Sequence, residues 1–136
     1  MRGTYVLLAR MPQNTQLEVG RLGILKFEEG LYAYVGSALS GIKNRVERHL
    51  KSEKKMHWHI DYFLTEAQVV NVIYGESEQR KECKIAKNLA KSFPSVRGFG
   101  SSDCSCKSHL FFSKNGNMEE EVIRCFKKVG MRPLRW

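Results

Sequence analysis

A nearly uninterrupted apolar segment at the start of the chain is the feature that most constrains its fold. Residues 3–11 (GTYVLLARM) are small, β-branched, aromatic or aliphatic, and Arg10 is the one charged side chain among them. Such a run is typical of a strand buried in a sheet. Pro12 ends it, because proline cannot donate to a strand ladder. We therefore expect the chain to fold around a sheet that contains this strand.

The remaining segments predict that helices cover this sheet. Strands are expected over residues 22–28, 31–37, 68–74 and 109–113, and helices over residues 42–51, 57–64, 76–93 and 118–128. The turn at residues 28–30 predicts a hairpin between the first two of these strands. Ser40 is expected to cap the first helix. The mixture predicts an α/β (α+β) fold, with a single domain over residues 1–136.

The charge of the chain points to a polyanionic partner. Its 23 Lys and Arg residues outnumber its 14 Asp and Glu residues, which gives a net charge of +9. Nucleic acid is the first candidate for such a partner, and a protein with a merely basic surface is the alternative. No apolar run approaches the roughly 18 residues of a membrane span. We expect a cytoplasmic protein with no membrane partner.

Glu82 breaks the burial pattern of its predicted helix. At helical spacing it falls at the centre of the apolar stripe formed by Ile85, Ala86, Leu89 and Phe93. A carboxylate that points into a protein must be paired, protonated or bound to a metal, because burying it alone is costly. The alternative is a side chain that turns out to solvent or pairs with an arginine.

Arg45 and His49 form a second unusual pair. They lie four residues apart on the helix expected over 42–51, so they share one side of it. A guanidinium beside an imidazole could grip a phosphate. A solvated basic helix edge next to a hydrogen-bonded core histidine is the alternative.

Tyrosines mark two of the predicted strands. Tyr5 lies in the first strand, and Tyr32 and Tyr34 share one face of the strand over 31–37. Such tyrosines usually pack with the hydroxyl at the rim. They become chemically important only where a phenol lies beside a base, a metal or a phosphate.

The cysteines suggest a metal site. In a cytoplasmic protein they are expected to be reduced thiols or metal ligands rather than disulfides. Cys104-x-Cys106-x-x-His109 brings together donors that zinc prefers, although the first spacing is tighter than usual. Cys83 or His57 could supply a fourth ligand, and the sequence selects neither. The alternative is a loop whose small thiols pack against the sheet.

Four residues near the first helix are expected to contact nucleic acid: Lys43, Arg48, His57 and Asp61. If residues 57–64 are helical, His57 and Asp61 share a face, because they are four positions apart. The alternative is that they are solvated neighbours of Trp58, Ile60 and Tyr62, which pack inward.

These pieces together resemble the GIY-YIG endonuclease superfamily. The matching elements, in order, are Gly3-Thr4-Tyr5, Tyr34-Val35-Gly36, Arg45-x-x-x-His49 and Glu82. Residues 56–62 and 98–110 are similar to a small stand-alone archaeal and bacterial subfamily, itself similar to repair and intron-encoded nucleases. An asparagine is common late in such domains. Asn115 and Asn117 match it only by position, and Asp103 or His109 could replace it.

The resemblance implies a fold and a reaction. It implies a small central antiparallel sheet flanked by helices, and metal-assisted hydrolysis of a phosphodiester. Glu82 would bind one Mg²⁺ or Mn²⁺ ion. Tyr5 would act as general base or position the attacking water, and Tyr34 would orient water and phosphate. Arg45 would neutralise growing charge, and His49 would hold Tyr5 or the phosphate.

Three functions remain open from the sequence. The first is a metal-dependent endonuclease acting on DNA rather than RNA, with a role in repair and a protein partner that supplies specificity. The second is a nucleic-acid-binding module of the same fold that does not use catalysis. The third is a small zinc protein built around Cys104, Cys106 and His109, with zinc in place of Mg²⁺ or Mn²⁺.

Overall fold

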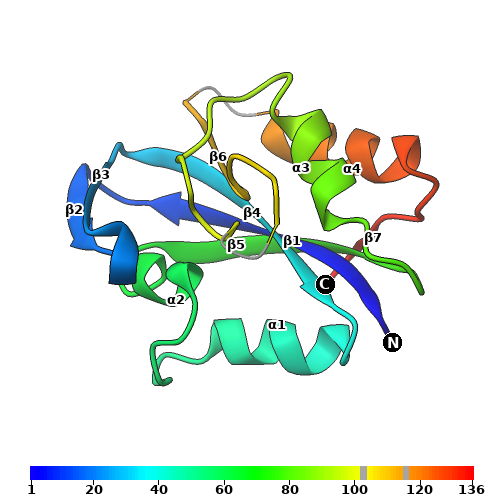
Figure 1. Cartoon of the computed structure of the whole chain (residues 1–136), viewed down its shortest axis with the longest axis horizontal. Helices are drawn as coiled ribbons and strands as arrows, with labels where there is room; N and C mark the ends of the chain where they lie inside the picture. Colours follow the sequence, from blue (N-terminus) through cyan, green and yellow to red (C-terminus); the bar gives the residue numbers. More distant parts are fainter. Residues whose placement is uncertain (102–103, 115–116) are drawn as a thin grey trace.

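The fold is a mixed α+β arrangement built on a five-stranded antiparallel sheet (Figure 1). The computed structural model describes residues 1–101, 104–114 and 117–136. The large sheet has the order β6-β4-β1-β5-β7, and β2 and β3 form a second, two-stranded sheet. In chain order the elements of the described residues are β1 (Gly3–Met11), β2 (Thr15–Glu18), a 3-10 turn (Gly20–Leu22), β3 (Ile24–Phe27), β4 (Gly30–Ala38), α1 (Ile42–Leu50), α2 (His59–Phe63), β5 (Gln68–Glu76), α3 (Glu82–Leu89), β6 (Leu110–Ser113), α4 (Met118–Lys128) and β7 (Leu134–Arg135).

β1 is the central strand, as its apolar sequence predicts. It pairs along its whole length with β4 on one edge and with β5 on the other. Its odd-numbered side chains, such as Leu7, join one apolar cluster, and its even-numbered ones, such as Val6, join another. Both faces of the strand are therefore buried, which explains why residues 3–11 lack the polar alternation of a half-exposed strand.

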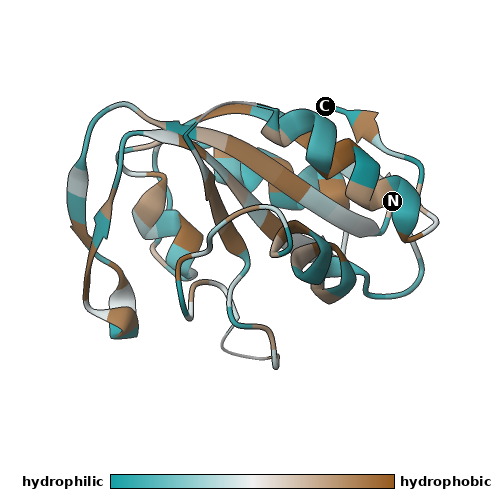
Figure 2. Cartoon of the chain, turned by 90° about the horizontal axis from the view of Figure 1, so that it is seen from above, coloured by the Kyte–Doolittle hydropathy of each residue, from teal (hydrophilic) through white to brown (hydrophobic). Residues whose placement is uncertain are grey.

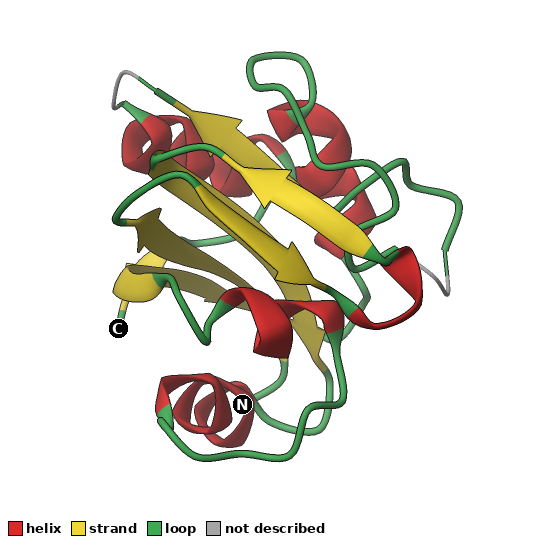
Figure 3. Ribbon diagram, turned by 90° about the vertical axis from the view of Figure 1, so that its left-hand side faces the viewer, coloured by secondary structure: helices red, strands yellow, loops and turns green. Residues whose placement is uncertain are grey.

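Helices cover both faces of the large sheet (Figures 1 and 3). α1 and α2 pack on one face through Ile42, Val46, Ile60 and Phe63. α3 and α4 pack on the other face through residues that include Ile85 and Phe126, and both helices show a hydrophobic and a hydrophilic side in Figure 2. The sheet covered by helices that the sequence predicts is confirmed.

The predicted hairpin between residues 22–28 and 31–37 is wrong. β3 pairs with β2, a strand that the sequence analysis missed, in a register that sets Thr15 opposite Phe27. β4 instead pairs with β1 on one edge and β6 on the other. A strand has only two edges, so β4 has none left for β3. The short strand β7 was also missed; it pairs with β5.

Two predicted helix boundaries also differ. Residues 68–76 form one continuous strand, so α3 begins at Glu82 rather than near residue 76. It also ends earlier, at Leu89. The N-cap of α1 is Gly41, not Ser40, with a φ of 130°, a conformation that residues with a side chain rarely adopt.

Two helices of opposite faces start at the same end of the sheet. Gly3, at the beginning of β1, lies opposite Ala38 at the end of β4 and opposite Glu76 at the end of β5. The chain leaves β4 from this end to form α1, and it leaves β5 from this end to form α3. The pairing of β6 with β4 stops at Tyr34, so the last residues of β4 lie beyond it.

A buried ion pair anchors α2 to α1. Arg48 donates two hydrogen bonds to the Asp61 carboxylate, at 2.8 and 2.9 Å. Asp61 is completely buried and also accepts the backbone N–H groups of His57 and Trp58, each at 2.8 Å. Burial by itself would raise the pKa of Asp61, but these hydrogen bonds and the positive charge of Arg48 lower it below its usual value. Asp61 is therefore ionised and holds the start of α2.

None of the helices in the described part of the chain has the length and hydropathy needed to span a bilayer.

We expect Asp61→Asn to reduce the free energy of unfolding by about 3 kcal/mol, because it leaves the partly buried Arg48 guanidinium without its countercharge. The measurement is urea denaturation at neutral pH. Glu66→Gln, just after α2 at an exposed position, is the matched control and should change stability by less than about 0.5 kcal/mol. A similar small change for both variants would contradict the structural role of Asp61.

Candidate active site and candidate metal centre

An open pocket of about 540 Å³ lies at the end of the sheet from which α1 and α3 start. Its lining includes Tyr5 of β1, Tyr34 of β4, Arg45 of α1 and Glu82 of α3. The sequence analysis singled out these four side chains separately. The fold brings them into one cavity, because α1 and α3 reach this end of the sheet from opposite faces.

Tyr5 and His49 form a buried hydrogen-bonded pair behind the pocket. The Tyr5 hydroxyl lies 2.7 Å from His49 Nε2. Burial raises the pKa of Tyr5, although the nearby positive charge of Arg45 works against this rise. Burial also lowers the pKa of His49 to about 4. Both groups are thus neutral near pH 7 and share one hydrogen bond, whose donor is set by the tautomer of His49.

Two glycines allow the pocket tyrosines to lie where they do. Gly36 faces Tyr5 across the β1–β4 ladder, and a Cβ atom there would overlap the Tyr5 ring. Gly100, in the loop before β6, has a φ of 70°, and a Cβ atom there would lie 2.9 Å from the Tyr34 ring. The glycine of the segment Tyr34-Val35-Gly36 therefore has a packing reason: only a residue without a side chain leaves room for Tyr5.

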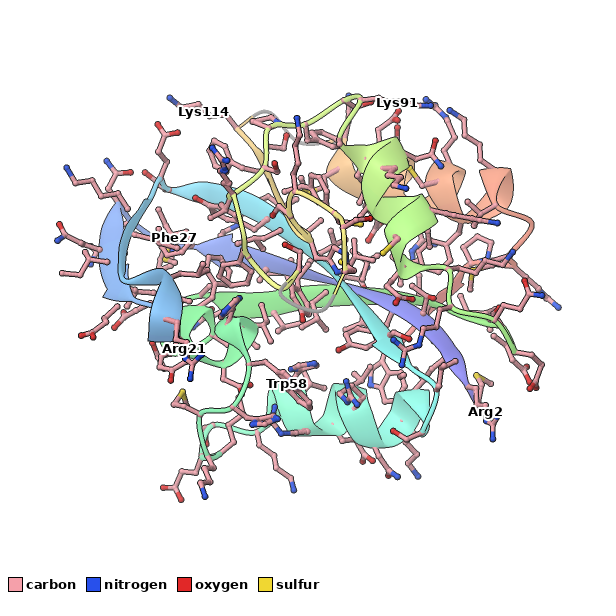
Figure 4. The ribbon with its side chains drawn as sticks, in the orientation of Figure 1. Arg2, Arg21, Phe27, Trp58, Lys91 and Lys114 are labelled. Carbon is pink, nitrogen blue, oxygen red and sulfur yellow. The ribbon has the colours of Figure 1, made fainter. Side chains whose placement is uncertain are left out.

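Arg45 is held at the edge of the pocket by a backbone carbonyl and an aromatic ring. Its Nη1 atom donates to the Ser37 carbonyl at 3.2 Å, and its guanidinium carbon lies 4.4 Å from the centre of the Trp58 ring. Trp58 lies beside α1 in Figure 4. The cation–π contact and the hydrogen bond fix a positive charge on the pocket wall.

Glu82 faces inward, as its position in the apolar stripe predicts. The residue is only 9% exposed, and its Oε2 atom is buried without a hydrogen-bond partner among the described residues. No arginine or lysine of the described residues forms an ion pair with it, so the solvated and paired alternatives do not apply. A buried carboxylate oxygen that lacks a partner is costly unless something else binds it.

Arg80 and His59 also line the pocket, although neither was among the residues expected to form the site. Arg80 is exposed and lines the pocket near Glu82, in the connection between β5 and α3. His59, at the start of α2, also lines it, and its Nδ1 atom accepts the Gly100 N–H at 2.8 Å. The apolar pattern did not reveal Arg80, because the predicted helix over residues 76–93 included it. In the structure that helix begins only at Glu82.

The four residues expected to bind nucleic acid have different surroundings. Lys43 is exposed on α1, and the exposed His57 lines the pocket. For Asp61 the expectation is wrong: it is completely buried and cannot reach a ligand in solvent. Arg48 is bound to Asp61 through two hydrogen bonds, so its guanidinium serves the fold.

The residues proposed as the late asparagine also differ in position. His109 lines the pocket. Asn117 caps α4 in a left-handed conformation and is not part of the pocket lining. Asp103 and Asn115 lie outside the described residues.

A second cluster of chemically active side chains adjoins the pocket. Cys83, Cys104, Cys106 and His109 have ligand atoms that all lie within 4.8 Å of one another. Cys83 is therefore the fourth member that the sequence left open, and His57 is not part of the group. Cys83 lies in the first turn of α3, and the other three residues lie in the segment that leads into β6. Together they form a candidate metal site.

Two donor-atom distances in this cluster are close to those of a tetrahedral site. His109 Nε2 lies 3.5 Å from Cys104 Sγ and 3.9 Å from Cys83 Sγ. A tetrahedral zinc ion with usual bond lengths separates its ligand atoms by about 3.6–3.8 Å. Burial, together with the neighbouring thiols, raises the pKa of Cys83. A bound cation would supply the positive charge that three adjacent thiolates require.

Comparison with known protein families matches residues 4–131 to DUF123, a domain of unknown function. Comparisons with curated proteins and with solved structures found no match.

The low pKa of His49 predicts a stability that falls in mild acid. The pKa is about 4 in the folded chain against an ordinary 6.5, so the unfolded chain binds more protons between these values. His49 therefore contributes its full stability above about pH 6.5 and loses it as the pH falls toward 4. The contribution is on the order of 3 kcal/mol.

Urea denaturation at pH 7 and pH 4.5 measures this effect. The wild type should lose more stability between the two conditions than His49→Gln, whose side chain does not titrate. Equal losses would show that His49 is not a buried neutral imidazole.

Proposed function

We propose an activity from the pocket itself, because the chain belongs to the DUF123 family, a domain of unknown function. The proposed activity is that of a divalent-metal-dependent endonuclease that hydrolyses phosphodiester bonds in DNA. One observation carries this proposal. Glu82, whose buried Oε2 atom has no hydrogen-bond partner among the described residues, lines the same cavity as two phenols and a guanidinium. This set combines a cation ligand, water-binding hydroxyls and a phosphate-binding charge.

Glu82 suits a hard, hydrated cation. A single carboxylate leaves most coordination positions to water and to phosphate oxygens, as Mg²⁺ and Mn²⁺ prefer. The unpartnered Oε2 atom is the ligand that the chain would offer. Such an ion, when bound, would stabilise negative charge on the leaving oxygen.

Tyr5 and His49 would handle the attacking water. With its hydrogen donated to His49 Nε2, the Tyr5 hydroxyl would use the lone pairs of its oxygen to accept a hydrogen bond from water. Burial raises the pKa of Tyr5, which favours a neutral phenol that positions the water. Tyr5 would hold the attacking water, and His49 would hold the Tyr5 hydroxyl in place.

The other pocket residues would bind the phosphate. Arg45 would stabilise the charge that grows on the phosphoryl oxygens, and Tyr34 would orient the water and the phosphate. Arg80 adds a second guanidinium at the pocket. The order Tyr5, Tyr34, Arg45, Glu82 is also the order of the GIY-YIG endonucleases that the chain resembles, which supports the same reaction.

DNA is the proposed substrate, with a role in repair. The net charge of +9 favours a polyanion, and binding should weaken as salt rises. The labelled cations Arg2, Arg21, Lys91 and Lys114 extend from several sides of the molecule in Figure 4 rather than from one stripe. Such a distribution offers little sequence-specific contact, so we infer that substrate structure or a protein partner supplies specificity.

The candidate metal centre is proposed to hold zinc rather than Mg²⁺ or Mn²⁺. Three thiols and an imidazole are soft or borderline donors, which select zinc over hard cations. A closed set of four protein ligands is typical of a structural site. If zinc binding at this centre were the only role of the protein, it would be a small zinc protein without nuclease activity.

We expect Glu82→Gln to lower DNA cleavage in Mg²⁺ or Mn²⁺ by about three orders of magnitude, because the amide is a poor ligand for the cation. DNA affinity should be kept or increased, since a negative charge leaves the phosphate site. Cleavage of plasmid and of branched DNA, with binding measured by fluorescence anisotropy, tests this. Glu76→Gln, an exposed residue at the end of β5, is the matched control and should keep wild-type activity.

Binding of DNA without cleavage by the wild type in any divalent metal would instead identify a non-catalytic binding module.

We expect Tyr5→Phe to reduce the cleavage rate by roughly 10²–10⁴-fold with DNA binding unchanged, because it removes the hydroxyl that would hold the water. Tyr32→Phe is its control: the Tyr32 hydroxyl also donates a hydrogen bond, partly buried, to the Glu28 carbonyl, and Tyr32 does not line the pocket. Comparable loss in both variants would attribute the effect to stability rather than to chemistry.

A further inference from the structure

The candidate metal centre joins two segments that both form the pocket wall. Cys83 directly follows Glu82 in the first turn of α3, while the three remaining ligands lie between residues 104 and 109. His109 lines the pocket together with Glu82. Whatever holds the four ligand atoms together therefore also fixes the distance between Glu82 and the opposite wall.

The loop before β6 is anchored on the side away from α3. His109 donates its N–H to the Phe99 carbonyl at 2.8 Å, and its carbonyl accepts the Val35 N–H at 2.9 Å. The Gly100 N–H bonds to His59 of α2 at 2.8 Å. These bonds fix the loop to β4 and α2. On the side of α3, the contacts made by Cys83 connect helix and loop.

The first turn of α3 lacks the usual support of a helix start. Its N-cap residue is Lys81, and no side chain caps the backbone N–H groups. A helix without a capping side chain is commonly less stable at that end. Glu82 is the first residue of this turn. Its Oε2 atom, which has no hydrogen-bond partner in the described part of the chain, thus lies on a turn without a side-chain cap.

We propose that Cys83, Cys104, Cys106 and His109 hold one tetrahedral Zn²⁺ ion that ties the first turn of α3 to the loop before β6 and thereby positions Glu82 in the pocket. Cys83 and the zinc ion are positioning elements and take no part in hydrolysis. The proposal of a zinc site depends only on its four ligands and not on the proposed nuclease activity. Only the role of Glu82 as a cation ligand rests on the proposed function.

Metal analysis of the full chain tests the site itself. Protein purified from zinc-containing medium should carry one zinc ion per chain by inductively coupled plasma mass spectrometry. The Co²⁺-substituted protein should show the intense visible absorption of tetrahedral thiolate-bound cobalt. Cys106→Ser should lose both signals, and Cys106→His, which restores a zinc ligand, should recover zinc. Cys125→Ser is the control, because Cys125 is buried on α4 and lies outside the cluster.

Mn²⁺ binding, followed by electron paramagnetic resonance without DNA, tests the positioning role. Loss of zinc in Cys106→Ser should weaken Mn²⁺ binding about ten-fold or more, as loss of supporting groups does at other metal sites. Cys125→Ser should stay within about two-fold of wild type. Glu82→Gln should lose Mn²⁺ binding while it keeps its zinc.

The outcomes separate this inference from the nuclease proposal. Zinc absent from the wild type, or a disulfide among the three cysteines in its place, overturns the site. Mn²⁺ affinity that does not change when zinc is lost, or no Mn²⁺ binding by the zinc-loaded wild type, overturns the positioning role. Zinc and Mn²⁺ binding as expected, without DNA cleavage, upholds the inference and rejects the nuclease.

Discussion

The register of β1 with its two neighbours is the constraint on which the rest of the structure depends. Gly3 is paired with the last residue of β4 and with the last residue of β5 at once, so three strand ends coincide. Backbone hydrogen bonds on both edges of β1 fix this arrangement, and a shift by one residue would exchange the side chains on its two faces. Because α1 and α3 both start at this end, their first turns converge on one pocket from opposite faces of the sheet.

The pocket collects groups that a stable protein would otherwise avoid. Among the described residues, Glu82 Oε2 is buried without a hydrogen-bond partner, while Tyr5 and His49 are buried as a neutral pair. A buried carboxylate oxygen without a partner reduces stability, and this cost supports the proposal that Glu82 binds a ligand. The buried carboxylate of Asp61 differs, because it accepts hydrogen bonds from Arg48 and from two backbone N–H groups. The contrast between Glu82 and Asp61 is the basis for the functional proposal.

Adjacent residues at the start of α3 contribute to two chemically different centres. Glu82 offers a hard oxygen ligand to the pocket, and Cys83 offers a soft sulfur ligand to the thiol cluster. Successive side chains on a helix point about 100° apart, so neighbours in sequence can face different surroundings. The two proposed sites would therefore select different metals by ligand type, with a hard cation at one and zinc at the other.

The sequence by itself determined which segments form the buried strand and the helices, because the spacing of apolar residues follows from the period of each element. It also placed Glu82 on the apolar stripe of its helix, with a solvated or paired side chain as the alternative, and it marked Tyr5, Tyr34 and Arg45 as unusual. It could not determine strand partners, since pairing joins residues far apart in the chain; the wrong hairpin shows this limit. Tertiary structure alone selected Cys83 as the fourth thiol-cluster member, added Arg80 to the pocket and buried Asp61 against Arg48. Each depends on a contact between separate elements, which no local pattern records.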